Sequence, residues 1–400
     1  MAMTKKKVAI LFDNPMCDFL PYSKKVLLEA RSLSSVYDVT VFCKNDLELN
    51  LARKEEKDGI KIVRCFDYFL GTTELVEKYI DSHIRLYNGI DSKFDVYHCH
   101  DPNTLPIGIE LAKRDNAKVV YEAHEYFPDY LILEWYMGNS FKYELTKLLT
   151  KAREAYIKNV HGVITASEEM AQALVDYYKL ERNPTTILNT RYKEDFLMAE
   201  QKKNEFNLRE KYKIDEQRNI LFFQGIVEPS RGIDYIVQAL PFIDNVTLLI
   251  AGESKYSHQE ELESIAHKLG CSEKLIFTGY LQSKELLAYT YQSDINLYFG
   301  KPTVLNMEFT IPNKMFDYLH SCKPMILSDL QSLKSFVTKY DIGEVINIHE
   351  VNVREIANQI SGLIEDTERY NTIVNNMKAT KERFVWEEEE IKLFALYESL

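Results

Sequence analysis

The chain has 400 residues, of which 46% are hydrophobic and 28% are charged, a composition typical of a folded globular protein. This length exceeds a single ordinary hydrophobic core, so we expect two domains. The formal net charge of -12 argues against general nucleic-acid binding, which needs a basic surface, and no nucleic-acid partner is expected. No apolar run approaches the roughly 20 residues that a membrane-spanning helix needs.

The first predicted strand, residues 8–12, follows a lysine-rich start. This apolar run is too short and ends too early for a signal peptide. The six cysteines contain no C-x-x-C pair, so we expect reduced, buried thiols. Both observations favour a cytoplasmic protein.

Short β-branched runs alternate with longer amphipathic stretches in the first half of the chain, which predicts βα units and a parallel sheet. The predicted strands are residues 8–12, 38–42, 59–64, 95–98, 118–121, 162–165 and 186–188, and the predicted helices include 23–34 and 141–159. We assign residues 1–190 to an N-terminal Rossmann-like domain.

Residues 191–217 lose this rhythm and become strongly charged, which predicts a linker. Strand signals then resume, at residues 219–223, 246–251, 274–278, 295–299, 324–328 and 344–348. Residues 218–383 are therefore the second predicted α/β domain.

Polar side chains follow two predicted strands of the first domain. His100 and Asp101 follow one strand, and His124 and Glu125 follow the next. Folds of this kind bind ligands at the carboxyl ends of their strands. His124 is suited to donate a hydrogen bond to a sugar hydroxyl or to handle a proton, and Glu125 to anchor an acceptor hydroxyl. The two histidine–carboxylate groups lie on separate loops without helix-spaced ligand pairs, so no metal site is expected.

Residues 138–162 form an amphipathic, locally basic stretch behind a run of aromatic residues. Two interpretations stay open for it. It is either a lip that touches anionic lipid and admits a lipid-linked acceptor, or a core-packed helix with a solvated face. Under the first interpretation the protein would lie peripherally at the inner face of the cytoplasmic membrane.

In the second domain, Gly225 follows the strand 219–223, and Arg231 lies further along the same loop. A guanidinium group fixed there suits a diphosphate, because it can bind one through two N–H groups. The alternative is a surface arginine beside a glycine turn. Gly279 and Tyr280 similarly follow another strand of this domain.

Residues 311–319 predict a helix whose start is suited to an anion. Pro312 favours the first helical turn, the free N–H groups there attract anions, and Lys314 adds a full charge. Asp317, one turn further on, can accept hydrogen bonds from hydroxyls such as those of a ribose. Diphosphate plus ribose indicates a nucleotide, whereas the alternative is a capped helix with a solvated Lys–Asp pair. The chain has no D-x-D sequence to hold a magnesium diphosphate.

In the order and spacing of these motifs, the chain resembles the retaining glycosyltransferases of the GT-B fold, in the group 1 family (family 4 of the sequence classification). The resemblance rests on residues 121–125, 162–167, 223–232, 249–252, 277–280 and 312–324. It implies an α/β, GT-B architecture with two Rossmann-like domains facing across a cleft. It also implies that residues 384–400 form a final helix that packs back on the N-terminal domain.

The resemblance implies roles for individual residues. Arg231 would hold the donor diphosphate, Asp317 would bind the donor ribose, and His124 would lie against the donor sugar. The remaining donor contacts would include Gly225, Gly279, Tyr280, Asn313 and Lys314, whereas His100, Asp101 and Glu125 would lie on the acceptor side. No metal or other cofactor is expected.

Some positions depart from the family's usual pattern. Ile226 stands where arginine usually follows the glycine, and Arg231 replaces the usual lysine. Phe309 occupies the usual place of the first glutamate, and Glu308 is one residue further from Asp317, which leaves its contact with the donor sugar open. Lys314 belongs to a Pro-Asn-Lys pattern found in a subset of the family and would replace the missing cation.

The predicted function is transfer of a sugar from a nucleotide-sugar, with a UDP-sugar favoured, to a hydroxyl of a glycan or lipid-linked acceptor. Configuration would be retained, and the setting would be bacterial surface polysaccharide biosynthesis. Arg231, Lys314 and the helix N-terminus would stabilise the departing diphosphate, while His124 would orient the substrates. Two alternatives are a catalytically silent GT-B-like subunit that binds a nucleotide or glycan, and a GT-B-fold sugar-nucleotide epimerase.

Overall fold

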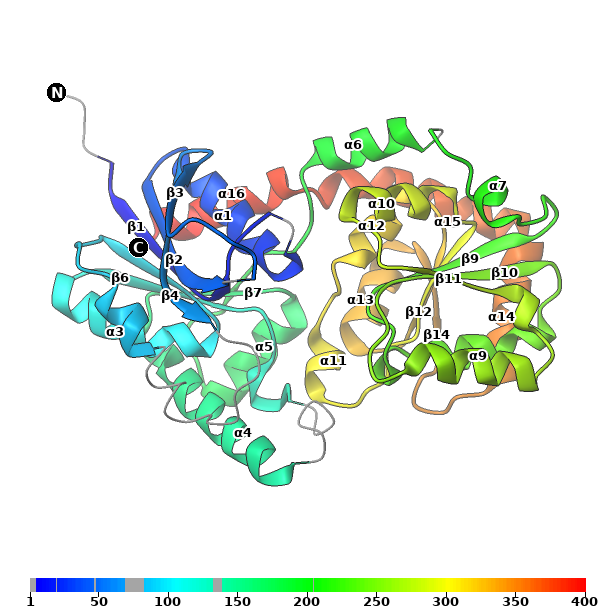
Figure 1. The fold of residues 1–400 in the computed structure, drawn as a ribbon, viewed down its shortest axis with the longest axis horizontal. Coiled ribbons are helices and arrows are strands. Elements are labelled where there is room, and N and C mark those ends of the chain that lie inside the picture. The colour runs from blue at the N-terminus through cyan, green and yellow to red at the C-terminus, as the bar shows by residue number, and fades with distance from the viewer. Residues whose placement is uncertain (1–4, 19, 47, 69–82, 132–138, 204) are drawn as a thin grey trace. The chain divides into compact units, whose positions relative to one another are not determined.

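The computed structural model describes residues 5–18, 20–46, 48–68, 83–131, 139–203 and 205–400. The chain forms two compact units, each built around one sheet (Figure 1). The first unit contains Met1–Asn189 together with Glu389–Leu400, and the second contains Thr190–Glu388.

The first unit has an eight-stranded sheet in the order β3-β4-β2-β1-β5-β6-β7-β8. Its strands are β1 (Lys7–Pro15), β2 (Asp38–Asp46), β3 (Lys54–Lys57), β4 (Ile60–Tyr68), β5 (Val96–His100), β6 (Lys118–Ala123), β7 (Gly162–Thr165) and β8 (Thr185–Thr186). Neighbouring strands run parallel except β3 and β4, which are antiparallel. Every residue of β5 is buried, as expected for a central strand of a parallel sheet covered on both faces.

The helices of the first unit connect these strands. The helices with both ends described include α1 (Lys24–Ser34), α3 (Asp101–Asp115), α4 (Ser140–Glu154) and α5 (Glu168–Tyr178), and the later part of α16 (Trp386–Glu398) also belongs to this unit. The end of α16 is anchored in this unit, because Leu393 and Tyr397 are buried there. No helix in the described part of the chain is long and apolar enough to cross a membrane.

The second unit has a six-stranded sheet in the order β11-β10-β9-β12-β13-β14, with every neighbouring pair parallel. Its strands are β9 (Asn219–Gln224), β10 (Val246–Ala251), β11 (Leu275–Gly279), β12 (Ile295–Tyr298), β13 (Met325–Ser328) and β14 (Gly343–Ile346). One face carries α9 and the other carries α10 and α12 (Figure 1). This doubly wound arrangement brings the carboxyl ends of its strands to one edge, where ligands bind in such folds.

The helices of the second unit are α6 (Lys193–Lys202), α7 (Leu208–Tyr212), α8 (Ile233–Ala239), α9 (His258–Lys268), α10 (Ser283–Gln292), α11 (Leu305–Phe309), α12 (Lys314–Ser321), α13 (Gln331–Tyr340), α14 (Val353–Glu365) and α15 (Thr367–Thr380). The segment 191–217, predicted as a linker, contains α6 and α7 and belongs to this unit. Phe196 on α6 stacks on His320 at a centroid distance of 3.5 Å. The buried residues of α6, Phe196 and Ala199, attach this segment to the domain. They were missed because the rest of the helix is highly charged.

Two further predicted elements differ in extent. The predicted strand 59–64 corresponds to β4, which forms a hairpin with β3. The strand β3 was not predicted, because its charged sequence has no hydrophobic alternation. The predicted helix 141–159 ends as α4 at Glu154 and continues as the 3₁₀ turn Ala155–Asn159. Both predicted elements therefore exist, but with different boundaries.

Candidate functional site

The loops after the central strands of the second unit approach one another closely. The backbone N–H of Gly225 donates to the carbonyl of Ala251 at 2.8 Å, and that of Gly252 donates to Gly279 at 3.0 Å. Gly225 has a φ of 132°, which favours glycine, and a Cβ at this position would collide with Nζ of Lys314. The glycine turn therefore leaves room for the lysine at the start of α12.

Lys314 and Arg231 both contact Tyr298, at the end of β12. Nζ of Lys314 lies 4.5 Å from the centre of the Tyr298 ring and 4.9 Å from that of Phe223. Nη1 of Arg231 donates a hydrogen bond of 3.1 Å to the Tyr298 hydroxyl. Burial and then the charge of Arg231 lower the pKa of Lys314 well below its usual value. Glu228 pairs with Nε of Arg231 at 2.9 Å. The site thus gathers two cationic side chains beside a glycine turn.

Asp317, one turn into α12, is 3% exposed and makes a bidentate ion pair with Arg191. Nε of Arg191 lies 2.7 Å from Oδ1, and Nη2 lies 2.9 Å from Oδ2. The amide of Gln224, next to Gly225, donates to Oδ2 at 2.9 Å. Sequence reasoning missed Arg191, because the residue lies in the segment predicted as a linker. The carboxylate of Asp317, which was predicted to bind a ribose, is therefore already bound by two side chains of the protein, Arg191 and Gln224.

The other predicted donor residues are more dispersed within the unit. Gly279 ends β11 with a φ of 70°, and Tyr280 after it is 65% exposed. Asn313 precedes α12 and is exposed. Oε2 of Glu308 accepts a 2.8 Å hydrogen bond from the backbone of Gln331 at the start of α13, and its other oxygen lies 3.6 Å from His349. Glu308 thus has a local structural contact away from Lys314.

In the first unit, the structure brings His124 together with His100 and Asp101, two of the predicted acceptor-side residues. Nδ1 of His100 lies 2.9 Å from Nε2 of His124, and the two rings stack with centroids 5.1 Å apart. The backbone N–H of His124 donates to Asp101 at 3.4 Å. Asp101 has a φ of 64°, an uncommon value for a residue other than glycine. His124 is partly exposed, as is Glu125. His124 therefore presents one ring nitrogen to the interior of the unit.

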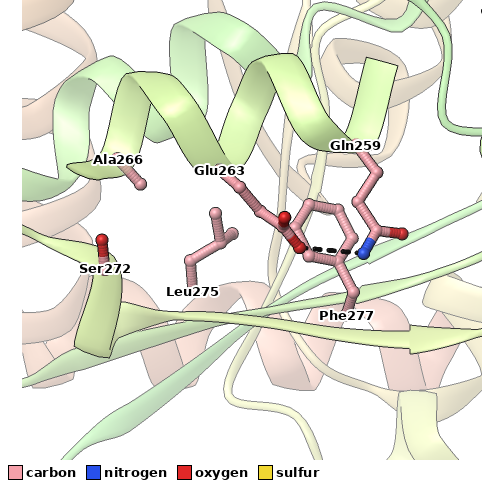
Figure 2. Close-up of a pocket in the computed structure, with 6 residues that line it drawn as sticks. All are labelled: Gln259, Glu263, Ala266, Ser272, Leu275 and Phe277. Carbon is pink, nitrogen blue, oxygen red and sulfur yellow. Dashed lines mark hydrogen bonds between the residues drawn. The ribbon is translucent and has the colours of Figure 1, made fainter. Parts of the chain in front are cut away.

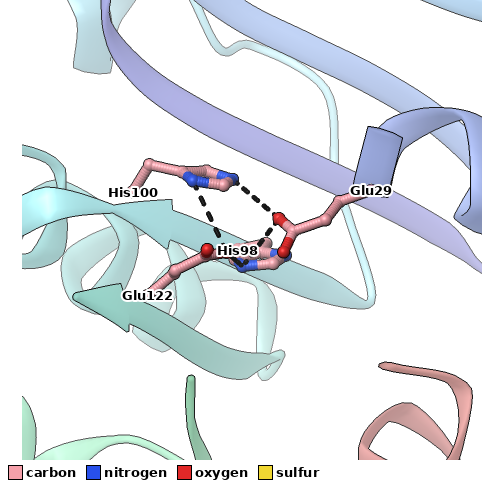
Figure 3. Close-up of side chains that lie close together, drawn as sticks. All are labelled: Glu29, His98, His100 and Glu122. Atoms are coloured by element: carbon pink, nitrogen blue, oxygen red, sulfur yellow. Dashed lines mark ion pairs between the residues drawn. The ribbon is translucent and has the colours of Figure 1, made fainter. Parts of the chain in front are cut away.

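Behind His124 lies a buried cluster of Glu29, His98, His100 and Glu122, with Lys25 beside it (Figure 3). Nε2 of His98 lies 3.3 Å from Oε2 of Glu122, and Nε2 of His100 lies 3.5 Å from Oε2 of Glu29. Burial raises the pKa of Glu29, and the negative charge of Glu122 raises it further. Burial lowers the pKa of His100. Sequence reasoning placed His100 and Asp101 at the end of one strand, and it missed Glu29 and Glu122 as partners of the histidines.

A hollow of about 310 Å³ lies between α9 and β11 in the second unit (Figure 2). Its lining includes Gln259 and Glu263, whose side chains are joined by a hydrogen bond of 2.9 Å. None of the predicted site residues lines it. The candidate donor site is instead the group around Gly225, Arg231 and Lys314.

Comparisons with known proteins identify the family of the chain. Residues 26–190 match the model of Glycosyltransferase Family 4, and residues 204–380 match that of Glycosyl transferases group 1. An uncharacterized glycosyltransferase of Methanocaldococcus jannaschii is 21% identical over 304 residues, which cover 75% of this chain and 73% of that protein.

Solved structures share the fold over nearly the whole length. Sucrose-phosphate synthase of Thermosynechococcus elongatus superposes with a TM-score of 0.76 at 15% identity, covering 98% of each chain. Anabaena HepE, in a complex with UDP and glucose, has a TM-score of 0.70 at 16% identity, covering 99% of this chain and 100% of that one. With both units matched by family models and the fold shared, the chain belongs to the group 1 glycosyltransferases of the GT-B fold.

Proposed function

We propose that this glycosyltransferase moves a sugar from a UDP-sugar to a hydroxyl of a glycan or lipid-linked acceptor, with retention of the anomeric configuration. The observation that carries the proposal is the pair of cationic side chains on Tyr298, Arg231 from one side and Lys314 from the ring face. Burial and then repulsion by Arg231 lower the pKa of Lys314, so a bound anion would favour its charged form. A diphosphate supplies that anion, and Gly225 leaves the space beside it.

The chemical step follows from this arrangement. The bond between the sugar's anomeric carbon and the diphosphate oxygen breaks, and a bond forms to the acceptor oxygen. The acceptor proton goes to the departing phosphate, so no dedicated protein base is needed. Negative charge grows on the diphosphate as the bond breaks, and Arg231 and Lys314 stabilise it from fixed positions.

Asp317 is proposed to bind the donor ribose with the one acceptor position that remains to it. A carboxylate offers about four lone-pair positions, and hydrogen bonds from Arg191 and Gln224 take three of them. The ion pair with Arg191 holds the carboxylate in one orientation. Gly279, Tyr280 and Asn313 are proposed to complete the donor contacts at the same edge of the sheet.

On the first unit, His124 is proposed to orient the donor sugar, and Asp101 and Glu125 to contact the acceptor. The support is that His100 and Asp101 fix the ring and the backbone of His124. The donor diphosphate would be neutralised by side chains and needs no metal ion in this scheme.

The donor base is proposed to be uracil, because the similar Anabaena HepE was crystallised with UDP and with UDP-glucose. A thermal-shift screen of UDP, GDP and ADP tests this choice, since a ligand that binds the folded state raises its apparent stability. We expect the largest shift with UDP. A larger shift with GDP or ADP would contradict uracil as the donor base, but it would still support a diphosphate site.

Turnover is tested by incubating the protein with UDP-sugars and a panel of saccharide acceptors. We expect nucleotide release together with a glycoside whose anomeric proton, by NMR, has the donor's configuration. Inversion would contradict retention. Binding without release would identify a catalytically silent subunit, and an altered sugar nucleotide formed without acceptor would identify an epimerase.

We also propose that α4 brings the protein to anionic membrane, in a setting of bacterial surface polysaccharide biosynthesis. Phe141 and Leu148 are 77% and 65% exposed, and their spacing of seven residues puts them on one face of the helix. Lys142 and Lys151 supply positive charge on the same helix. Residue 138, the first of the predicted stretch 138–162, lies outside the described residues.

Sedimentation with vesicles tests this membrane contact. We expect the protein to bind phosphatidylglycerol-containing vesicles more than phosphatidylcholine vesicles, and the double substitution Phe141→Ser/Leu148→Ser to remove most of that binding. Leu269→Ser, at a residue 44% exposed in the second unit, is the matched control. Equal sedimentation of all three proteins would favour a helix with a merely solvated face.

A further inference from the structure

Four potential ligand atoms point inward in the buried cluster of the first unit (Figure 3). They are Oε2 of Glu29, Nε2 of His98, Nε2 of His100 and Oε2 of Glu122, and among the described residues none of them has a hydrogen-bond partner outside this group of four. All four residues are at least 98% buried. Buried polar atoms normally have partners, so a group of four such atoms facing each other needs an explanation.

Two of three separations among these atoms match the edges of a coordination tetrahedron, and the third is slightly longer. Zinc bonds to histidine nitrogen and carboxylate oxygen are about 2.0–2.2 Å long, which gives ligand–ligand edges of roughly 3.3–3.6 Å in a tetrahedron. The observed separations are 3.3 Å from His98 to Glu122, 3.5 Å from His100 to Glu29 and 3.9 Å from His98 to Glu29. One ligand atom from each of the four residues lies within 4.8 Å of the others.

The two histidines have hydrogen-bond partners at their outward ring nitrogens, and the two glutamates have an ion-pair partner at their outward oxygens. Nδ1 of His98 lies 2.9 Å from the Tyr397 hydroxyl, and Nδ1 of His100 lies 2.9 Å from Nε2 of His124. The outward oxygens of Glu29 and Glu122 lie 3.4 Å and 3.9 Å from Nζ of Lys25. Metal-ligating histidines characteristically donate their second ring N–H to such a partner, and ligating carboxylates are held in the same way.

We propose that Glu29, His98, His100 and Glu122 bind one divalent transition-metal ion, best matched by Zn²⁺, inside the first unit. Two imidazoles and two carboxylates in a four-coordinate arrangement suit this ion. The two carboxylates balance its charge, while Lys25 is held separately by the carbonyl oxygens of Ile187 at 3.1 Å and Leu188 at 3.4 Å. The closed shell of protein ligands makes the ion structural.

The proposed metal site is linked to a partly exposed residue by the contact between His100 and His124. Once Nε2 of His100 is a ligand, its Nδ1–H donates to Nε2 of His124, which fixes the orientation and tautomer of that exposed ring. His100 is then a positioning residue for His124. The metal site itself does not depend on the proposed sugar transfer, because it rests only on the buried geometry.

The direct test is elemental analysis of the untagged full chain, purified from cultures supplied with Zn²⁺ or with Co²⁺. We expect about one equivalent of metal per chain, and an intense visible absorption from tetrahedral Co²⁺. Glu29→Gln and His98→Gln should retain at least tenfold less metal. Glu260→Gln and His267→Gln make the same changes at exposed residues of α9 and should retain the full metal content of the wild type.

X-ray absorption of the metal-loaded wild-type chain keeps the test decisive if the variants fail to fold. The expected spectrum has nitrogen and oxygen ligands at about 2.0–2.2 Å with two imidazole contributions. In the same sample, ¹⁵N NMR should show His124 protonated at Nδ1. Folded wild-type chain without stoichiometric metal from either culture would overturn the proposal, as would sulfur ligands or undiminished metal in the variants.

Discussion

The two charged clusters of this protein lie at the ends of parallel strands in different units, but they differ in their access to solvent. Arg231 and Lys314 are partly exposed in the second unit. Glu29, His98, His100 and Glu122 are buried in the first. The solvent-accessible pair Arg231 and Lys314, here called the open cluster, can bind and release a substrate anion many times. The buried group of two glutamates and two histidines can hold only an ion that is taken up during folding. Exposure, more than residue type, separates the proposed substrate site from the proposed metal site.

The largest expected effect on stability comes from breaking the ion pair between Asp317 and Arg191 in the second unit. Arg191→Met leaves the carboxylate buried without its cation, which costs about 3–5 kcal/mol of unfolding free energy. Urea unfolding measures this loss. The double substitution Arg191→Met/Asp317→Leu should be less destabilised than the single one, because no unpaired charge remains. A single variant as stable as the wild type would show that the pair is not needed under the open cluster.

The cations of the open cluster should dominate turnover. Arg231→Ala and Lys314→Ala each remove a fixed charge from the departing diphosphate and should lower kcat/KM by about 10²–10³-fold. Lys339→Ala is the control, since Lys339 also faces an aromatic ring, that of Tyr340 at 5.6 Å, but outside the site. Steady-state assays with the donor identified by the thermal-shift screen give the values. Equal losses in the control would mean a general effect of removing lysine–aromatic contacts.

Glu154 is a further buried acid, and it forms no ion pair with any residue in the described part of the chain. Glu154 accepts hydrogen bonds from the hydroxyls of Tyr121 at 2.9 Å and Tyr178 at 2.7 Å, and burial raises its pKa to about 7. The folded state therefore holds a proton that the unfolded state releases near the ordinary pKa of 4.5. Stability from this group is complete below about pH 4.5 and is lost as the pH rises through about 7, a change of about 3 kcal/mol.

Glu154→Gln tests this linkage, because the amide cannot ionise. The difference in unfolding free energy between variant and wild type should shift in the variant's favour by about 3 kcal/mol between pH 4 and pH 8. Glu144→Gln, at an exposed residue of α4, should show no such shift. A difference that does not change with pH would show that Glu154 has the same pKa in the folded and the unfolded protein.

The smallest expected effect is at the glycine that makes room for Lys314. Gly225→Ala combines an unfavourable φ with a collision at Nζ of Lys314, and should cost about 1–3 kcal/mol of stability while weakening UDP binding. Gly270→Ala has a φ of 69° but nothing within 4 Å of the new Cβ, so it isolates the backbone strain. UDP titration of both variants separates the two causes. If Gly270→Ala weakened UDP binding as much as Gly225→Ala does, the collision with Lys314 would not explain the loss of binding.

Much of the architecture could be predicted from the sequence, because buried parallel strands have a continuous apolar pattern. The grouping of Gly225, Arg231 and Lys314 followed from their positions after strands and at a helix start. The partners that decide each cluster's chemistry could not be predicted. Arg191 reaches Asp317 from a segment with a linker's composition, and Glu29 reaches His98 and His100 from a helix far upstream. Such pairings depend on side-chain approach across the fold, which one sequence does not record.

The central claim is that the second unit binds a diphosphate through Arg231 and Lys314. Isothermal titration with UDP and with uridine tests it most directly, because the two ligands differ only in the diphosphate. UDP should bind the wild type far more tightly than uridine does, and this difference should largely disappear in Arg231→Ala/Lys314→Ala. A double variant that still prefers UDP to the same extent would contradict the claim.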